Sequence, residues 1–217
     1  MFERLFRGAG PKVTPDALPV VRNITIGRTV VLDTLAWRRH AGINFTLDRD
    51  TLEIVAQGTL RLDEGSWVHR FYTEDDLMLQ AVSSSASGAD ADDFTVFQAW
   101  SSTYPTSRAD RDAFLARLRA PVWHEPSLPA FTRFWYDGDD RDQPPVSLWE
   151  AVHDDRDGIP DRHIEQTCML YARDLSEGEA EDGGLELLLA LAMQPEGGDR
   201  THEIMIGLPL SIAEFSA

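Results

Sequence analysis

The sequence predicts an α+β fold, which consists predominantly of antiparallel β-sheet with few helices and one clear helix near residues 107–119. Three observations lead to this class. Apolar and polar residues alternate in several short runs, as they do in a strand with one buried face. Clusters of glycine, proline, serine and aspartate separate these runs at short intervals, which is typical of strands joined by turns. A single segment combines the apolar spacing of a helix with a capping residue at its start.

The first half of the chain is expected to be rich in strands. Residues 20–26 have the composition of a strand, and residues 52–57 alternate apolar and polar side chains until Gly58 interrupts them. The clearest hairpin joins residues 66–72 to residues 77–82 through the polar turn between them. These runs predict a meander of antiparallel strands.

The helix is expected after an aromatic, β-branched strand at residues 94–100. Ser107 can cap the first turn, and Asp110 stands three residues later as a short partner in a capping box. Pro121 stops the helix. Three apolar residues share one face of the helix: Phe114, Leu115 and Leu118.

The second half repeats the strand pattern. Strands are expected at residues 131–136, around Leu148, and at residues 164–173. Residues 185–193 and 202–208 suggest a terminal hairpin, although residues 185–193 also fit a short buried helix, because a continuous apolar run has no diagnostic period. One face of the third strand is expected to carry Ile164, Gln166, Cys168, Leu170 and Ala172.

The 217 residues suit one α+β domain over residues 20–217, preceded by an N-terminal segment and linker over residues 1–19. The linker is inferred from glycines and prolines at residues 8–19, which break regular structure. An alternative division gives two β-rich lobes that meet near residues 121–129. The sequence does not define the oligomeric state.

Charge and cysteine content narrow the class of protein. A formal net charge of −17 repels phosphate backbones, so nucleic acid is not an expected partner. Cys168 is the single cysteine, so no intrachain disulfide forms and a cytoplasmic protein is expected. No secretory signal or transmembrane run is recognised.

One stretch of the hairpin, residues 67–80, is similar to the YjfK-like family of uncharacterised bacterial proteins. The similarity extends to residues 93–115, to the order of the C-terminal strands and to the ending at residues 207–211. The family is a domain of unknown function, so the resemblance implies no catalytic residue. Its members are encoded near membrane-stress proteins of the phage-shock type, which implies a cytoplasmic or membrane-peripheral accessory role.

A ligand site is one hypothesis for the hairpin end. His69 and Arg70 precede Glu74 and Asp75, so a histidine that accepts a proton and an arginine that clamps an anion could meet carboxylates there. The competing interpretation is a half-exposed strand with a charged turn. The single cysteine is expected to be a core thiol.

A calcium site is a second hypothesis, for the acidic turn at residues 153–161. Asp155, Asp157 and Asp161 could direct oxygen ligands into one turn around Gly158. His153 occupies the first ligand position, where calcium prefers a carboxylate, so a surface turn without a metal is the favoured interpretation. No other cofactor is expected.

An anchor is the third hypothesis. Phe2, Leu5 and Phe6 fall on one side of a helical turn, which would suit a protein groove or a membrane surface. A frayed terminus is the alternative interpretation.

No local catalytic motif is recognised in the sequence, so the expectation leans away from an enzyme. The leading hypothesis is an accessory or interaction protein with a protein partner and peripheral membrane association. The alternative is a small-ligand protein or enzyme whose site is assembled from distant residues around His69 and Arg70.

Overall fold

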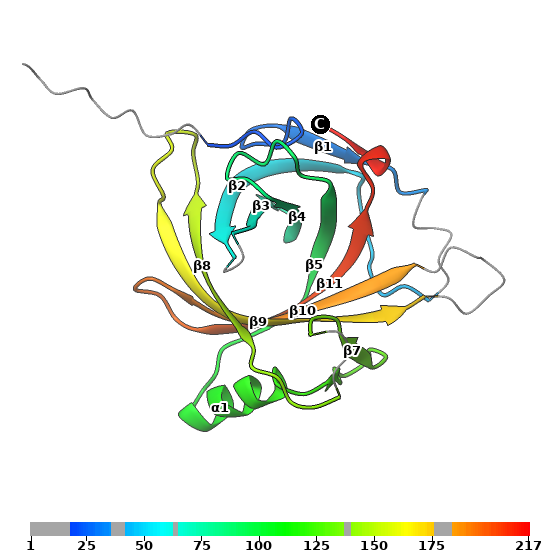
Figure 1. The fold of residues 1–217 in the computed structure, drawn as a ribbon, viewed down its shortest axis with the longest axis vertical. Helices are drawn as coiled ribbons and strands as arrows, with labels where there is room; N and C mark the ends of the chain where they lie inside the picture. The colour runs from blue at the N-terminus through cyan, green and yellow to red at the C-terminus, as the bar shows by residue number, and fades with distance from the viewer. Residues whose placement is uncertain (1–17, 36–41, 63–64, 137–139, 176–183) are drawn as a thin grey trace, which may run out of the picture.

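The computed structural model describes residues 18–35, 42–62, 65–136, 140–175 and 184–217. Of the chain, 50% lies in strands and 7% is helical, so the α+β class predicted from the sequence is wrong. The fold is a closed antiparallel β-barrel of eight strands (Figure 1). In chain order, the elements are β1 (Thr29–Leu32), β2 (Thr51–Arg61), β3 (Trp67–Thr73), β4 (Leu77–Ser83), β5 (Asp93–Thr103), α1 (Arg108–Arg117), β6 (Val122–Trp123), β7 (Phe131–Arg133), β8 (Val146–His153), β9 (Arg162–Asp174), β10 (Leu185–Pro195), β11 (Thr201–Leu210), the 3-10 helix η1 (Ile212–Glu214) and β12 (Phe215–Ser216).

The barrel closes because β8 pairs with two strands. The wall runs β2–β3–β4–β5–β11–β10–β9, and β8 joins β9 on one side to β2 on the other. Every neighbouring pair is antiparallel. The β2–β8 pairing joins segments that are far apart in the sequence, Gly58 with Val152 for example. Closure removes the free edges of the sheet, and local sequence patterns carry no sign of it.

Two hairpins lie where the sequence predicts them. β3 and β4 form the first, with Phe71 opposite Leu79. β10 and β11 form the second, which decides between the two alternatives for residues 185–193 in favour of a strand. β10 lies in the middle of the wall between β9 and β11, and both of its faces are buried. A strand buried on both faces has a continuous run of apolar residues, as a buried helix does. This explains why the sequence of residues 185–193 fits both.

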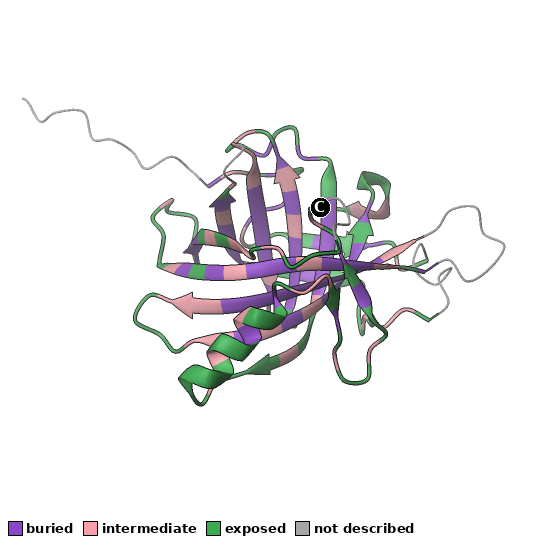
Figure 2. Ribbon diagram, turned by 60° about the horizontal axis from the view of Figure 1, so that its bottom comes forward, coloured by how far each residue is buried: buried purple, intermediate pink, exposed green. Residues whose placement is uncertain are grey.

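The helix expected at residues 107–119 spans Arg108–Arg117. Ser107 is its N-cap, and its hydroxyl accepts the Asp110 backbone N–H at 3.1 Å. Phe114 is the buried residue of the helix, and the outward side of α1 is exposed (Figure 2). None of the helices within the described residues has the length and apolar character needed to cross a membrane.

One set of alternating side chains fills the interior of the barrel. Tyr72 on β3 and Met193 on β10 pack against the same interior cluster, although their strands are not adjacent. Glycine makes room at a crowded point, since a Cβ on Gly207 would lie 2.5 Å from the Phe97 ring. The buried apolar residues of the two interior clusters are Ala56, Met78, Phe97, Val152, Ile164, Cys168, Ala172, Leu187, Leu189 and Leu191.

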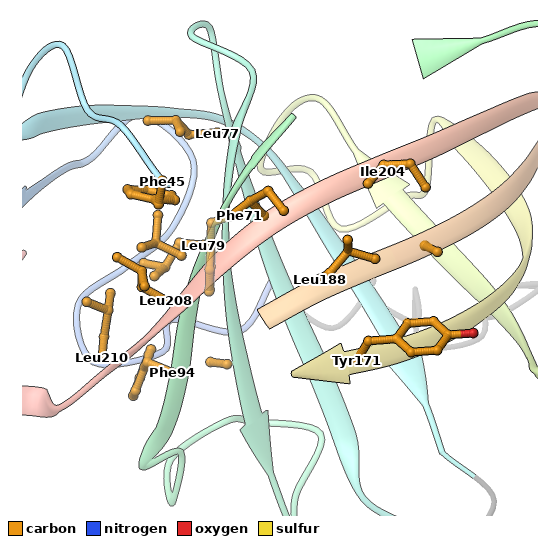
Figure 3. Packing of buried hydrophobic residues seen from close by; sticks show 14 of the residues in the cluster. Phe45, Phe71, Leu77, Leu79, Phe94, Tyr171, Leu188, Ile204, Leu208 and Leu210 are labelled. Carbon is orange, nitrogen blue, oxygen red and sulfur yellow. The ribbon is translucent and has the colours of Figure 1, made fainter. Parts of the chain in front are cut away.

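The other set of side chains points outward and forms a second core beneath two covers. The N-terminal cover (described residues 18–32 and 42–50) packs on one part of the wall, where Phe45 lies near Leu79 and Leu208 (Figure 3). The helical cover (residues 104–136) packs on β9–β11, where the rings of Trp123 and Tyr171 lie 5.5 Å apart. The wall is therefore apolar on both faces where a cover lies over it.

A buried carboxylate ties the N-terminal cover to the wall. Glu186 on β10 is fully buried and accepts the Phe45 backbone N–H at 3.1 Å and the Asn44 side-chain amide at 2.9 Å. Arg173 on β9 donates to the same carboxylate at 2.8 Å. Glu186 thus compensates for its burial with a cation and with amides of the cover.

We predict that Glu186→Ala lowers the free energy of unfolding by about 3 kcal/mol, because Arg173 and the cover amides lose a shared acceptor in a buried place. Urea unfolding measures the loss, and hydrogen exchange should show faster exchange at Asn44 and Phe45. Glu53→Ala, at an exposed position on β2, is the matched control and should change stability by less than about 0.5 kcal/mol. Equal effects of the two substitutions would contradict the role of Glu186.

Candidate functional site

The main polar cluster of the interior is built around Arg70. Arg70 is 3% exposed, and its side chain points into the barrel from β3. Its Nη1 donates to Glu150 Oε2 on β8 at 3.0 Å and to Gln166 Oε1 on β9 at 2.7 Å. Its Nε donates to Gln80 Oε1 on β4 at 3.1 Å. β2 and β8 lie between β3 and β9 in the wall, so Arg70 reaches Gln166 across the concave side of the barrel.

Glu150 is the acceptor at the centre of this network. It is 0% exposed, and it accepts the Tyr72 hydroxyl at 2.7 Å in addition to Arg70 and the Gln166 side-chain amide. Gly58 provides the space, because a Cβ there would lie 1.8 Å from Glu150 Oε1. A glycine inside a strand often marks a close approach of another group, and here that group is a carboxylate. We call Arg70, Tyr72, Gln80, Glu150 and Gln166 the interior network.

Burial and charge set the protonation states of the network. Burial opposes the charge on Arg70, but the Glu150 carboxylate and Tyr72 outweigh it and raise the pKa of Arg70 above its usual value. Burial and the Glu150 carboxylate both raise the pKa of Tyr72, so its hydroxyl stays protonated. Burial also raises the pKa of Cys168 to about 12, against the smaller opposing effect of Arg70. The thiol is therefore a neutral core group and not a nucleophile.

The arrangement can hold strands in register, because the anion held by the Arg70 guanidinium is a carboxylate of a neighbouring part of the wall. Arg70 is charged and bonded to three side-chain oxygens, and its carboxylate partner comes from the protein itself. A buried charge pair with every partner in place specifies one packing of the strands that carry it. The network therefore fixes the relative positions of β3, β4, β8 and β9.

The predicted ligand site does not come together in the structure. His69 and Arg70 are neighbours in β3, so their side chains point to opposite sides of the wall. His69 points outward, is buried, and its Nε2 lies 3.1 Å from Ser83 Oγ. Glu74 and Asp75 lie in the exposed turn after β3, where Asp75 pairs with Arg49. Of the four predicted residues, Arg70 alone belongs to the interior network.

The acidic turn is organised by its own backbone. Asp155 accepts the Asp157 N–H at 2.8 Å, and Asp157 accepts the Ile159 N–H at 2.7 Å. Asp161 accepts the Asp154 N–H at 2.7 Å. In the part of the chain that the structure describes, no three histidine, cysteine or acidic side chains form a group suited to a metal. The calcium site stays a prediction from the sequence.

The predicted anchor residues Phe2, Leu5 and Phe6 lie outside the described residues. A surface cavity of about 620 Å³ lies in the N-terminal cover. It is lined by Thr34, Ile43 and residues 45–50, so it does not gather side chains from distant strands.

Sequence reasoning missed most of the interior network, although two signals were present. Gln166 is expected on the same face of its strand as Cys168 and Leu170, and the structure confirms that phase, since all three lie on the interior face. A polar residue among apolar ones on a buried face needs a partner. Gly58 interrupts an otherwise regular strand, which is the second signal. Glu150 itself has no local signature.

A second candidate site lies on the outside of the barrel, where neither cover reaches. The outward side chains of Phe71 and Tyr171 are buried, whereas Trp149 on β8 is 56% exposed. Its ring stacks on that of His163, with centroids 5.9 Å apart. Arg61 lies over the ring of Trp67 at 6.0 Å from its centroid. We call Arg61, Trp67, Trp149, His163 and Glu165 the outer tryptophan strip.

Strand register places the strip in one row across four strands. Trp67 on β3 is opposite Arg61 on β2, and Trp149 on β8 is opposite Glu165 on β9. Leu60 and Glu150 are the last pair that joins β2 to β8. Arg61 follows Leu60 and Trp149 precedes Glu150, so these two residues come next to each other in the same register. The row therefore runs Trp67, Arg61, Trp149, Glu165, with His163 beside Trp149.

Two buried histidines lie beneath the covers. Burial lowers the pKa of His69, against the Ser85 backbone and Asp90, which raise it. Burial and Arg200 lower the pKa of His202, against Asp110, and the His202 ring stacks on Phe114 at 4.0 Å. His69 Nδ1 and His202 Nε2 are buried and lack a hydrogen-bond partner among the described residues. Both histidines are therefore held in the neutral form.

These features define the class: a closed eight-stranded antiparallel barrel with a buried polar network inside and an exposed aromatic row outside. The family model described as "Protein of unknown function (DUF2491)" matches residues 1–216, so the chain belongs to that family. This match supports the expectation of an uncharacterised family and does not confirm the YjfK-like name. Comparisons with curated proteins and with solved structures gave no match.

We predict that Arg70→Met lowers the free energy of unfolding by about 3–5 kcal/mol, because Glu150 keeps its burial and loses its cation. Glu150→Gln should cost less than Arg70→Met, since a neutral amide can still accept from Tyr72. Arg49→Met, which breaks the exposed pair with Asp75, is the control and should cost less than about 1 kcal/mol. Urea unfolding measures all three, and similar values for Arg70→Met and Arg49→Met would refute the importance of the buried pair.

We also predict a loss of stability on acidification through the two buried histidines. Their pKa values are lower in the folded than in the unfolded state, so unfolding takes up protons. Their contribution is present above the unfolded pKa of about 6.5 and is lost as the pH falls through the folded values, with a slope of at most about 1.4 kcal/mol per pH unit for each histidine.

The double variant His69→Gln, His202→Gln should therefore show a weaker dependence of unfolding free energy on pH between pH 7 and pH 5. Urea unfolding at several pH values measures the slope. His124→Gln is the control, because His124 is exposed. An unchanged slope in the double variant would contradict the prediction.

Proposed function

We propose that the protein is a non-enzymatic interaction protein that binds a protein partner through the outer tryptophan strip. The observation that carries the proposal is the exposure of Trp149, 56%, on the part of the wall that neither cover protects. Large exposed aromatic side chains in a connected row are typical of protein interfaces.

The residue types of the strip support this role. Tryptophan and arginine dominate the binding energy of many interfaces, because each buries a large area with few groups left unpaired. Trp149 is held by its stacking on His163, and Arg61 is held over Trp67 by a cation–π contact. Side chains that are already fixed in place lose less conformational entropy when a partner binds.

The interior network supports the strip from the other side of the wall. Glu150 follows Trp149 directly in β8, and its carboxylate is bonded to Arg70 and Tyr72 of β3. The strand that carries Trp149 is therefore fixed to β3, which carries Trp67. In this proposal the barrel is a rigid support and the strip is its contact surface.

The partner class follows the family resemblance. The resemblance to the YjfK-like family implies an accessory role near membrane-stress proteins of the phage-shock type, and a position at the membrane periphery is therefore part of the proposal. The N-terminal residues Phe2, Leu5 and Phe6 are the proposed membrane or partner anchor.

We predict that Trp149→Ala reduces capture of the partner at least about tenfold, because the aromatic centre of the contact is removed. The protein is crosslinked in cells, and the captured proteins are quantified by mass spectrometry from soluble and membrane fractions. Trp100→Ala is the matched control, since Trp100 is 40% exposed on β5 and is not part of the strip.

A partner lost from Trp149→Ala and kept by Trp100→Ala supports the proposal. The proposal is overturned if Trp149→Ala and Trp100→Ala both keep every partner of the wild type. The alternative from the sequence, a small-ligand protein, is tested separately by thermal-shift screening against metabolites and metals, where a saturable shift supports a ligand.

A further inference from the structure

We propose that the partner bound by the outer tryptophan strip is a second copy of this chain, in a two-fold dimer with Trp149 at its centre. The inference rests on the proposed function of the strip. It adds the identity of the partner, which the order of charges along the strip specifies.

The charges lie on opposite sides of Trp149. Arg61 is on β2 and Glu165 is on β9, the two strands that flank β8. Neighbouring strands are about 4.8 Å apart, so the two charged positions lie at similar distances from Trp149 in opposite directions. The strip is therefore positive on one side of its central ring and negative on the other.

A two-fold axis that runs along β8 through Trp149 makes this order self-complementary. Such an axis places β2 of one copy against β9 of its partner. Arg61 then meets the partner's Glu165, and Glu165 meets the partner's Arg61, while the two Trp149 rings meet at the axis. An isologous interface requires this reciprocity, in which residue i contacts j and j contacts i. Like charges are not brought together.

The neighbours of these residues fit the same axis. Ala151 lies two residues after Trp149 on the outer face of β8, and its small side chain allows the two walls to approach. Thr59 and His163 are the residues opposite Ala151 on β2 and β9. The axis therefore places the Thr59 hydroxyl of one copy against His163 of the other, where a hydrogen bond can form.

Both charged residues are available for such contacts. Arg61 and Glu165 are exposed, and neither has an ion-pair partner in the ranges that the structure describes. The net charge of −17 on each copy opposes association, so opposite charges at the contact are needed to offset the repulsion.

The test is a charge exchange in the full-length protein, measured by analytical ultracentrifugation at pH 7.5 and about 0.15 M salt. The wild type should form a concentration-dependent dimer. Arg61→Glu and Glu165→Arg should each weaken it at least about tenfold, because each places like charges in contact. The double variant should regain the wild-type dissociation constant within about threefold. Trp149→Ala should weaken the dimer at least about tenfold.

Matched controls come from α1. Arg108 and Asp112 are exposed and form an i,i+4 pair with an N–O distance of 3.6 Å. Arg108→Glu, Asp112→Arg and their double variant change the net charge by the same amounts and should leave dimerisation within about twofold of the wild type. Circular dichroism verifies that each variant is folded.

Three results would overturn the dimer: a monomeric wild type at concentrations up to about 100 µM, no rescue in the double variant, or a dimer that is insensitive to Trp149→Ala. A monomer whose crosslinked partners still depend on Trp149 overturns the dimer and leaves the proposed function in place. A dimer that requires Trp149 and obeys the charge exchange supports both.

Discussion

The ion pair between Arg70 and Glu150 is the interaction on which the rest of the structure depends. It links β3 to β8 across β2, at the place where the wall closes on itself. Both charges are buried, so the pair is stable only when the surrounding strands supply the remaining hydrogen bonds, which Tyr72, Gln80 and Gln166 do. Closure of the barrel and completion of the network therefore require one another.

The two covers explain how a barrel of this size buries apolar residues on both faces of its wall. The interior takes one set of alternating side chains, and the N-terminal and helical covers take the other. The outward residues Ser147 and Trp149 of β8 lie outside both covers and are exposed. Trp149, the exposed tryptophan of the row, thus lies on the strand that closes the barrel, and this strand contributes to both the interior network and the outer strip.

Local features of this fold could be predicted from sequence, and its closure could not. The β3–β4 hairpin and the Ser107 cap of α1 depend on neighbouring residues, so alternation and capping identify them. The β2–β8 pairing joins residues about 90 positions apart, and nothing local marks it. The predicted ligand site treated His69 and Arg70 as one group, although the two-residue period of a strand separates them. Alternation in the sequence predicts the correct face for Gln166, but only the closed barrel identifies Glu150 as its partner.

Gly58 has a consequence for how this family can vary. Its missing side chain is the space that the Glu150 carboxylate occupies, so positions 58 and 150 share one volume. A relative with a larger residue at position 58 has no room for a glutamate at position 150. An arginine at position 70 would then lack its counter-ion. The three positions are expected to change together or not at all, so their joint pattern in relatives separates barrels with a charged centre from barrels with an apolar one.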